Sequence, residues 1–180
     1  MKSEIEVKAK IKDFDTLVYK LKEIGCILSE PIIQNDFIYN KKGVNLRDLN
    51  HNTPVLRIRE QGEQIIFNLK KNRSNEIDCI EKEIEVSDKN ILEDIFKLLD
   101  YKKTVEVHKK RRKGKYHDYE ICLDEVQDLG SFIEVEKMSD EDGGKVQEEL
   151  FNFLKTLGIR DEDRVLIGYD SMIWLKNNQE

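Results

Sequence analysis

Pairs of like-charged residues recur in this sequence, and one apolar residue separates the two members of each pair. The pairs are Glu4-x-Glu6, which Lys8 continues, Arg57-x-Arg59, Glu83-x-Glu85 and Glu134-x-Glu136. Paired carboxylates are hard oxygen ligands that suit Mg²⁺ or Mn²⁺, whereas guanidinium and ammonium groups suit phosphate oxygens. The two sets together indicate a ligand in which a divalent metal accompanies a polyphosphate.

An ionic strand face also has an ordinary explanation, because a Glu-x-Glu-x-Lys segment is common by chance and usually faces solvent. Three glutamate pairs and an arginine pair in one chain favour a shared polar site instead. The sequence has no glycine-rich phosphate loop of the Walker or Rossmann kind. Side chains rather than backbone amides would therefore hold the phosphate.

The spacing of the apolar residues predicts the elements that carry these pairs. Alternation with period two predicts about eight strands, and the clearest cover residues 4–11, 55–59, 64–70, 83–86, 105–113, 119–123 and 132–136. Helical spacing predicts three amphipathic helices, which begin after Asp13, Ser87 and Ser139. Residues 41–54 and 72–78 lack periodicity and are predicted to be loops.

Each predicted strand has one ionic face and one apolar face, and the apolar face is suited to receive the three helices. If the sheet were flat, the ionic face would be solvated. If it curls into a barrel, carboxylates and guanidinium groups converge in a polar interior. Such an interior must be wet or filled by an ionic ligand, because burying unpaired ions is costly.

Length and composition indicate one folded domain over residues 1–180. Charged residues make up 38% of the chain, as apolar residues do, and the net charge is −6. Acidic and basic residues are interleaved with apolar ones, which argues against disorder. The longest apolar run, Met172 to Leu175, is too short for a membrane span, and the N-terminus lacks an apolar signal core. We therefore expect a cytoplasmic protein without a membrane partner.

Two further residue sets have simple explanations. The cysteines Cys26, Cys79 and Cys122 are odd in number and lack Cys-x-x-Cys spacing, so we expect reduced residues that fill space. The basic run from Lys109 to Lys113 could contact nucleic acid, but the negative net charge and the lack of an aromatic stacking set argue against that partner.

The order of the charged motifs resembles the CYTH superfamily of triphosphate tunnel metalloenzymes. The motifs that carry the resemblance are Glu4-x-Glu6-x-Lys8, Leu56-Arg57-Ile58-Arg59, Lys70, Glu83-x-Glu85, Asp124 and Phe132-Ile133-Glu134-Val135-Glu136. The superfamily includes class IV adenylate cyclases, thiamine triphosphatases and inorganic triphosphatases. The resemblance implies an α+β fold, in which a closed eight-stranded antiparallel β-barrel forms the triphosphate tunnel and helices pack outside it.

The resemblance also implies roles for individual residues. Metal-ligand positions of the family, for Mg²⁺ or Mn²⁺, are matched by Glu4, Glu6, Glu134 and Glu136. Triphosphate-binding positions are matched by Lys8, Arg57, Arg59, Lys70, Lys109 and Arg111. Catalytic roles fall to Glu6, Lys8 and Asp124. The basic run leaves its register open, and we choose Lys109 and Arg111, rather than Lys110 and Arg112, as the residues that point inward.

Gln34-x-Asp36 with Tyr39, and the later segment from Cys122 to Phe132, are similar to the class IV cyclase branch. The expected reaction is conversion of ATP to cyclic AMP and pyrophosphate. Hydrolysis of an inorganic, nucleoside or thiamine triphosphate is the alternative, and a non-catalytic module that binds triphosphate or polyphosphate is another. A homodimer is left open, because members of the family often form dimers.

Overall fold

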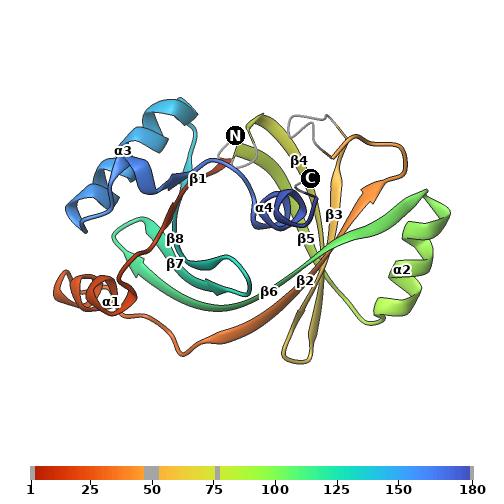
Figure 1. Cartoon of the computed structure of the whole chain (residues 1–180), viewed down its shortest axis with the longest axis horizontal. Coiled ribbons are helices and arrows are strands. Elements are labelled where there is room, and N and C mark those ends of the chain that lie inside the picture. The colour runs from red at the N-terminus through yellow and green to blue at the C-terminus, as the bar shows by residue number, and fades with distance from the viewer. Residues whose placement is uncertain (1–2, 47–52, 76–77, 179–180) are drawn as a thin grey trace. The chain divides into compact units, whose positions relative to one another are not determined.

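The computed structural model describes residues 3–46, 53–75 and 78–178. It divides into two compact units, one made of residues 1–32 and 110–166 and the other of residues 33–109 and 167–180. Both units contain antiparallel strands and helices, so the predicted α+β class with a large antiparallel sheet is confirmed (Figure 1). The assignment of residues 1–180 to one domain stays a prediction.

The first unit contains the strand order β6-β7-β8-β1-β9. Its elements are β1 (Ser3–Lys10), α1 (Phe14–Glu23), the second half of β6 (Tyr101–Tyr116), β7 (Tyr119–Val126), β8 (Gly130–Ser139), α3 (Gly143–Thr156), a 3₁₀ turn (Asp161–Asp163) and β9 (Arg164–Val165). Strands β1 and β8 pair with Glu6 opposite Glu136 and Lys8 opposite Glu134. This register places both glutamate pairs on one face of the sheet.

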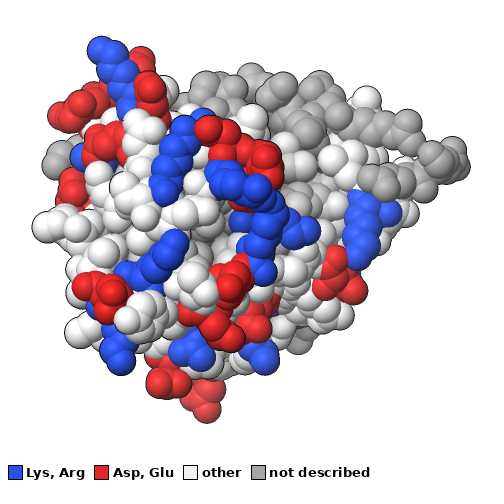
Figure 2. Space-filling model, turned by 60° about the vertical axis from the view of Figure 1, so that its left-hand side comes forward, with Lys and Arg blue, Asp and Glu red and all other residues white. Residues whose placement is uncertain are grey.

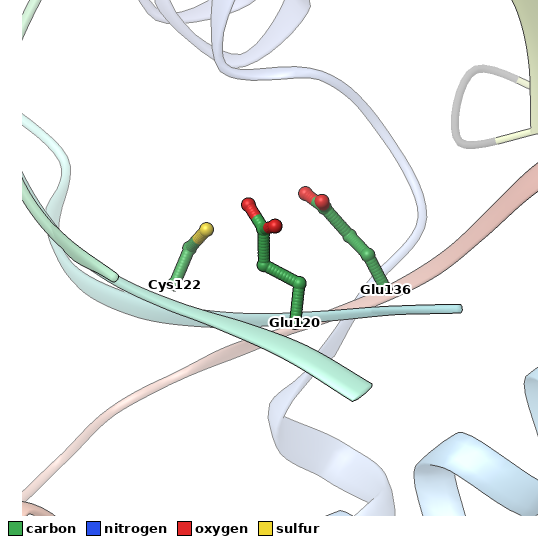
Figure 3. A group of neighbouring side chains, drawn as sticks. All are labelled: Glu120, Cys122 and Glu136. Carbon is green, nitrogen blue, oxygen red and sulfur yellow. The ribbon is translucent and has the colours of Figure 1, made fainter. Parts of the chain in front are cut away.

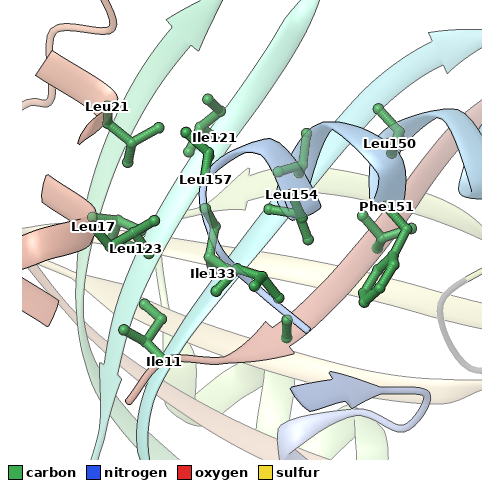
Figure 4. Packing of buried hydrophobic residues seen from close by; sticks show 14 of the residues in the cluster. Ile11, Leu17, Leu21, Ile121, Leu123, Ile133, Leu150, Phe151, Leu154 and Leu157 are labelled. Atoms are coloured by element: carbon green, nitrogen blue, oxygen red, sulfur yellow. The ribbon is translucent and has the colours of Figure 1, made fainter. Parts of the chain in front are cut away.

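The opposite face of the first unit forms its apolar core. Ile5, Val7 and Ala9 of β1 are at most 2% exposed, as the alternating pattern predicts. Helices α1 and α3 supply the covering residues, among them Leu21 and Leu154, which are fully buried (Figure 4). Because the helices use this face, the ionic side chains are left on the other one.

The second unit contains the strand order β5-β4-β3-β2-β6. Its elements are β2 (Ile32–Lys41), β3 (Val55–Gln61), β4 (Gln64–Asn75), β5 (Asp78–Val86), α2 (Lys89–Leu98), the first half of β6 and α4 (Tyr169–Asn177). Phe96 of α2 packs with Tyr39 and Phe67, at ring centroid distances of 5.0 and 5.4 Å. Helix α2 therefore covers the apolar face of this unit, and the arginine pair lies on the other face.

The structure corrects the predicted closed eight-stranded barrel. The described residues form nine strands in the order β5-β4-β3-β2-β6-β7-β8-β1-β9, and among them no pairing joins the end strands β5 and β9. The additional strand, β9, has two residues, too few to produce an alternating pattern. It pairs with β1 at Lys8 and Ala9.

Two smaller predictions about elements were also wrong. Residues 72–75 continue β4 and Asp78 already belongs to β5, although this polar segment was predicted to be a loop; residues 76–77 lie outside the described chain. Helix α4 was missed because Met172 to Leu175 are consecutive apolar residues without helical spacing.

The helix caps illustrate local control of the fold. Asp13 accepts a hydrogen bond from the Thr16 backbone, as predicted, whereas Asp88 and Asp142, rather than Ser87 and Ser139, cap α2 and α3. A carboxylate directly before the first turn is a strong acceptor and carries a charge that the helix N-terminus favours. The serines stand too early in the chain for this role.

The surface of the described chain is mixed in charge. Figure 2 shows lysine, arginine, aspartate and glutamate side chains interspersed on the face in view, as the interleaved sequence predicts. Cys26 and Cys122 are buried free cysteines, and the side chain of Cys79 lies outside those described. Among the helices within residues 3–46, 53–75 and 78–178, none combines the length and apolar character of a membrane span.

Candidate active site

Three of the predicted metal ligands come together on the first unit. One carboxylate oxygen each from Glu4, Glu6 and Glu136 lie within 4.8 Å of one another. They converge because Glu6 and Glu136 are direct partners across β1 and β8, and Glu4 follows on the same face of β1. Hard oxygen donors at this spacing fit a divalent cation such as Mg²⁺ or Mn²⁺.

Electrostatics of this carboxylate trio support the same assignment. Burial raises the pKa of Glu136 well above its usual value, and the carboxylates of Glu134, Glu6 and Glu4 raise it further. Like charges in a partly buried site favour the protonated form unless a cation compensates them. The trio therefore has the donor chemistry and the charge excess that a cation site requires.

Glu134, the fourth predicted metal ligand, lies in ion pairs instead. Its carboxylate pairs with Lys8 Nζ at 3.2 Å and also with the Arg111 guanidinium. Arg111 in turn donates from Nε and Nη2 to both carboxylate oxygens of Asp124, at 2.7 and 2.5 Å. All four side chains are at most 7% exposed, so this network fixes two cations on the polar face.

Lys8 connects the buried network with the carboxylate trio. Its ammonium lies 3.5 Å from a Glu6 oxygen as well as beside Glu134. Of the residues predicted to be catalytic, Glu6 and Lys8 lie on β1 and Asp124 lies on β7. Strand β8 pairs with both of these strands, and the three residues share one face of the sheet. The first unit places carboxylates and cations side by side, as metal-bound phosphate would need.

Glu120 and Cys122 are two site residues that sequence reasoning missed. They lie on β7, and their side chains extend from the sheet toward the same side as Glu136 (Figure 3). One ligand atom each from Glu120, Cys122 and Glu136 lie within 4.8 Å of one another. The alternation of β7 could have revealed them, since Glu120, Cys122 and Asp124 occupy every second position. Burial raises the pKa of the Cys122 thiol far above its usual value, so it stays protonated.

A cavity of about 320 Å³ borders these carboxylates. Glu4, Glu120 and Glu136 line it together with basic side chains, among them Lys115 and Lys137. The carboxylates therefore have access to an open space that can admit a small anion or a hydrated metal ion.

The second unit carries the arginine pair. Arg59 donates from Nε and Nη2 to the two oxygens of Asp36, at 2.7 and 2.8 Å, and both residues are at most 9% exposed. Burial raises the pKa of Asp36, but the charges of Arg57 and Arg59 outweigh it and hold that pKa well below the usual range. Asp36 thus stays ionised and fixes the orientation of the guanidinium group.

Arg57 has a different set of partners. Its Nη2 donates to Glu81 at 2.9 Å and to Glu83 at 3.1 Å. Lys70 lies opposite Glu81 in the β4–β5 register. Burial raises the pKa of Glu81, and the charges of Arg57 and Lys70 lower it below its usual value. Glu81 and Glu83 therefore both hold the Arg57 guanidinium in place. The family resemblance left Glu83 without a definite role and did not include Glu81.

The structure confirms the chosen register of the basic run. Lys109 and Arg111 are 6% and 7% exposed, whereas Lys110 is exposed to solvent. Lys109 belongs to the second unit, where its ammonium lies 5.1 Å from the centre of the Tyr169 ring. Arg111 belongs to the first unit and its carboxylate network.

Comparison with known protein families identifies the family of this chain. The CYTH domain model matches residues 2–169, which is nearly the whole chain. The protein belongs to the CYTH family. A curated relative from Methanocaldococcus jannaschii, named "Putative adenylate cyclase MJ0240", is 34% identical over 170 residues, which cover 92% of this chain and 95% of the relative.

Solved structures show the same fold at lower identity. The PH1819 protein of Pyrococcus horikoshii OT3 aligns with a TM-score of 0.81 at 23% identity, over 97% of this CYTH chain and 99% of that one. A Hippeastrum protein, HpAC1, aligns with a TM-score of 0.65 at 16% identity, over 100% and 97% of the two chains. That protein is described as a "putative adenylyl cyclase" with a dominant triphosphatase activity.

Proposed function

We propose that this CYTH protein is a metal-dependent enzyme that converts ATP to cyclic AMP and pyrophosphate, as class IV adenylate cyclases do. The observation that carries the proposal is the carboxylate trio of Glu4, Glu6 and Glu136 beside the buried cations Lys8 and Arg111. A site for phosphate alone gains nothing from extra carboxylates, because they repel the ligand. Carboxylates next to cations suit a metal-bound phosphate.

Glu4, Glu6 and Glu136 would hold Mg²⁺ or Mn²⁺. Glu134 is a fourth proposed ligand on the family resemblance alone. When bound, such an ion polarises a phosphate oxygen and neutralises charge that develops during phosphoryl transfer. Glu134 supports the site in a second way, because its ion pairs hold Lys8 and Arg111 in place.

The proposed triphosphate-binding residues are distributed over both units. Lys8 and Arg111 belong to the first unit, and Arg57, Arg59, Lys70 and Lys109 belong to the second. Carboxylates orient the guanidinium groups of Arg111 and Arg59 before the substrate arrives. Such preorganised donors stabilise a transition state more than mobile ones do. That the sheet curls into a tunnel around the triphosphate stays a prediction.

In the proposed reaction the ribose 3′-hydroxyl attacks the α-phosphorus in line. A bond forms between O3′ and the α-phosphorus, and the bond from the α-phosphorus to the bridging oxygen breaks, so that pyrophosphate leaves. The hydroxyl proton passes to a carboxylate, for which Glu6 is the candidate because it lies at the edge of the trio beside Lys8. Lys8 stabilises the negative charge on the phosphate, and Asp124 acts by positioning Arg111.

Hydrolysis of a triphosphate is the second candidate function. It uses the same residues, but water attacks the terminal phosphorus in place of the ribose hydroxyl. The specific observation that favours it is the triphosphatase activity named for the Hippeastrum protein of the same fold. A non-catalytic module that binds triphosphate would have no use for the carboxylate trio.

Product analysis tests these candidates. The purified protein is incubated with ATP or tripolyphosphate and Mg²⁺ or Mn²⁺, and cyclic AMP, pyrophosphate and phosphate are measured. Cyclic AMP supports the cyclase, and phosphate alone supports the hydrolase. Binding of triphosphate without any product would refute an enzyme function.

Glu6→Ala tests the site assignment in the same assay. The variant should lose metal-dependent turnover by at least about a hundredfold, because it lacks a proposed metal ligand. It should keep its fold, because Glu6 lies at the end of the network and is partly exposed. Glu125→Ala is the matched control, since this exposed glutamate lies on β7 outside the site. Full turnover by Glu6→Ala would show that the metal site is wrongly assigned.

A further inference from the structure

Two amide side chains are buried on the polar face of the second unit. Gln34 lies on β2 two positions before Asp36, and Asn68 lies on β4 directly opposite Arg57. Each is only 1% exposed. Both therefore share the face of the arginine pair and are out of contact with bulk solvent.

Both amides use their nitrogen within the protein and leave their oxygen unpaired. Gln34 Nε2 donates to Gln61 Oε1 at 2.7 Å, and Asn68 Nδ2 donates to Glu83 at 3.1 Å and also to Glu81. Gln34 Oε1 and Asn68 Oδ1 are buried and accept no hydrogen bond from the described part of the protein. Buried polar atoms normally have a partner, because leaving one unpaired is costly.

The chemistry of these atoms restricts what can pair with them. An amide oxygen is an acceptor, and the oxygens of an ionised triphosphate are acceptors too, so the phosphate chain cannot satisfy it. An N–H or O–H group can. The unpaired oxygens therefore fit a ligand with a donor-bearing organic part in addition to its phosphates.

The position of Gln34 indicates which part of the ligand it would contact. It pairs with Gln61, which lies opposite Gln64 at the end of the β3–β4 hairpin, and Gln64 reaches Glu85 at 3.4 Å. This end of the polar face is rich in amides, whereas the neighbouring positions carry Asp36 and Arg59. A charged segment followed by an amide-rich segment matches a phosphate chain followed by a base.

We propose that Gln34 is a specificity-determining residue whose Oε1 accepts a hydrogen bond from the exocyclic amino group of a nucleobase. The substrate class is then a nucleoside triphosphate with an amino-bearing base, rather than inorganic triphosphate. This inference rests on the proposed action on a triphosphate. It goes further, because it assigns base recognition to a residue outside the metal and phosphate sets.

The test compares three substrates with Mn²⁺: ATP, purine riboside triphosphate, which lacks the amino group, and tripolyphosphate. The quantity measured is kcat/KM, or the dissociation constant where no turnover occurs. We expect the wild-type protein to prefer ATP over purine riboside triphosphate by about tenfold or more, because a site built to bind a donor rejects an analogue without one.

Gln34→Leu removes the acceptor and keeps a side chain of similar size. It should lower kcat/KM for ATP to about the value for purine riboside triphosphate, so that the preference for ATP disappears. The kcat/KM for tripolyphosphate should not change. Gln34→Glu keeps an acceptor and should keep the preference. Gln64→Leu is the control, because Gln64 lies at the same end of the face but is exposed and should alter none of the three values.

Each other outcome has a defined meaning. An equal loss for all three substrates in Gln34→Leu, or a wild-type protein that does not distinguish the two nucleotides, would overturn the role of Gln34. A wild-type protein that uses tripolyphosphate but not ATP would overturn it and leave triphosphate chemistry in place. A protein that neither binds nor turns over any of the three would refute the proposed function itself.

Discussion

Replacing Glu136 with glutamine tests the electrostatics of the carboxylate trio, because it removes one charge and keeps the shape. Oxygens of Glu136 and Glu6 lie within 4.8 Å. At an effective dielectric constant of about 20, two carboxylates at this separation repel by about 3.5 kcal/mol. Protonation of Glu136 limits this cost, so Glu136→Gln should raise the free energy of unfolding of the metal-free protein by about 1 to 3 kcal/mol near pH 8.

The effect of Glu136→Gln should depend on pH with a defined sign. The pKa of Glu136 is raised in the folded protein above the ordinary value of 4.5, so the folded state binds this proton more tightly than the unfolded state. Its contribution to stability is fully present below about pH 4.5 and is lost as the pH rises toward the folded pKa. The advantage of the variant should therefore grow between about pH 5 and pH 8.

Thermal unfolding with a chelator, and then with added Mn²⁺, measures both parts of this prediction. For a chain of this size, each kcal/mol shifts the melting temperature by about 2 to 4 °C. With chelator the variant should melt above the wild-type protein. With Mn²⁺ the wild-type protein should gain more, because only it retains all three carboxylates.

Glu134→Gln is the matched control on the same strand, and its effect should have the opposite sign. Its carboxylate compensates Lys8 and Arg111, so removing the charge leaves buried cations less well paired. The free energy of unfolding should fall by about 3 kcal/mol without metal. If both variants lowered the stability of the metal-free protein alike, the assignment of Glu136 to a site of excess negative charge would be refuted.

Two further predictions concern stability. Asp36→Asn should lower the free energy of unfolding by about 3 kcal/mol at pH 7, because Arg59 loses its buried partner. Since the pKa of Asp36 is depressed in the folded protein, the wild-type advantage is present above about pH 4 and is lost as the pH falls through the folded pKa. Chemical denaturation at pH 7 and pH 2 should show this loss. If the difference in unfolding free energy between the wild-type protein and the variant did not shrink at pH 2, the prediction would be contradicted. Leu154→Ala, at a fully buried position of α3, should cost about 2 to 5 kcal/mol in the same experiment, whereas Leu98→Ala, at a position 85% exposed, should cost little. Equal losses in the two leucine variants would show that the described core of the first unit is wrong.

The alternating sequence predicted much of the sheet, because the period of two is a local property of the strand backbone. It placed Ile5, Val7 and Ala9 in the core and the charged residues between them on the other face, and the structure confirms both. The choice of Lys109 and Arg111 within the basic run came from the family resemblance, because five consecutive basic residues leave the alternation undefined. Elements without a period, such as β9 and α4, were not predictable in this way.

The sequence by itself determined the residue types and their spacing, and with them the family. A carboxylate or guanidinium at every second position also fixes which face of a strand can bind ions. Only the tertiary structure decided which charges meet. Glu136 joins Glu4 and Glu6, while Glu134, two residues earlier, pairs with Lys8 and Arg111, because strand register brings different partners opposite each residue. The tertiary structure also revealed the unpaired, buried oxygen of Gln34, since the lack of a hydrogen-bond partner depends on the neighbouring side chains in the fold and not on the sequence.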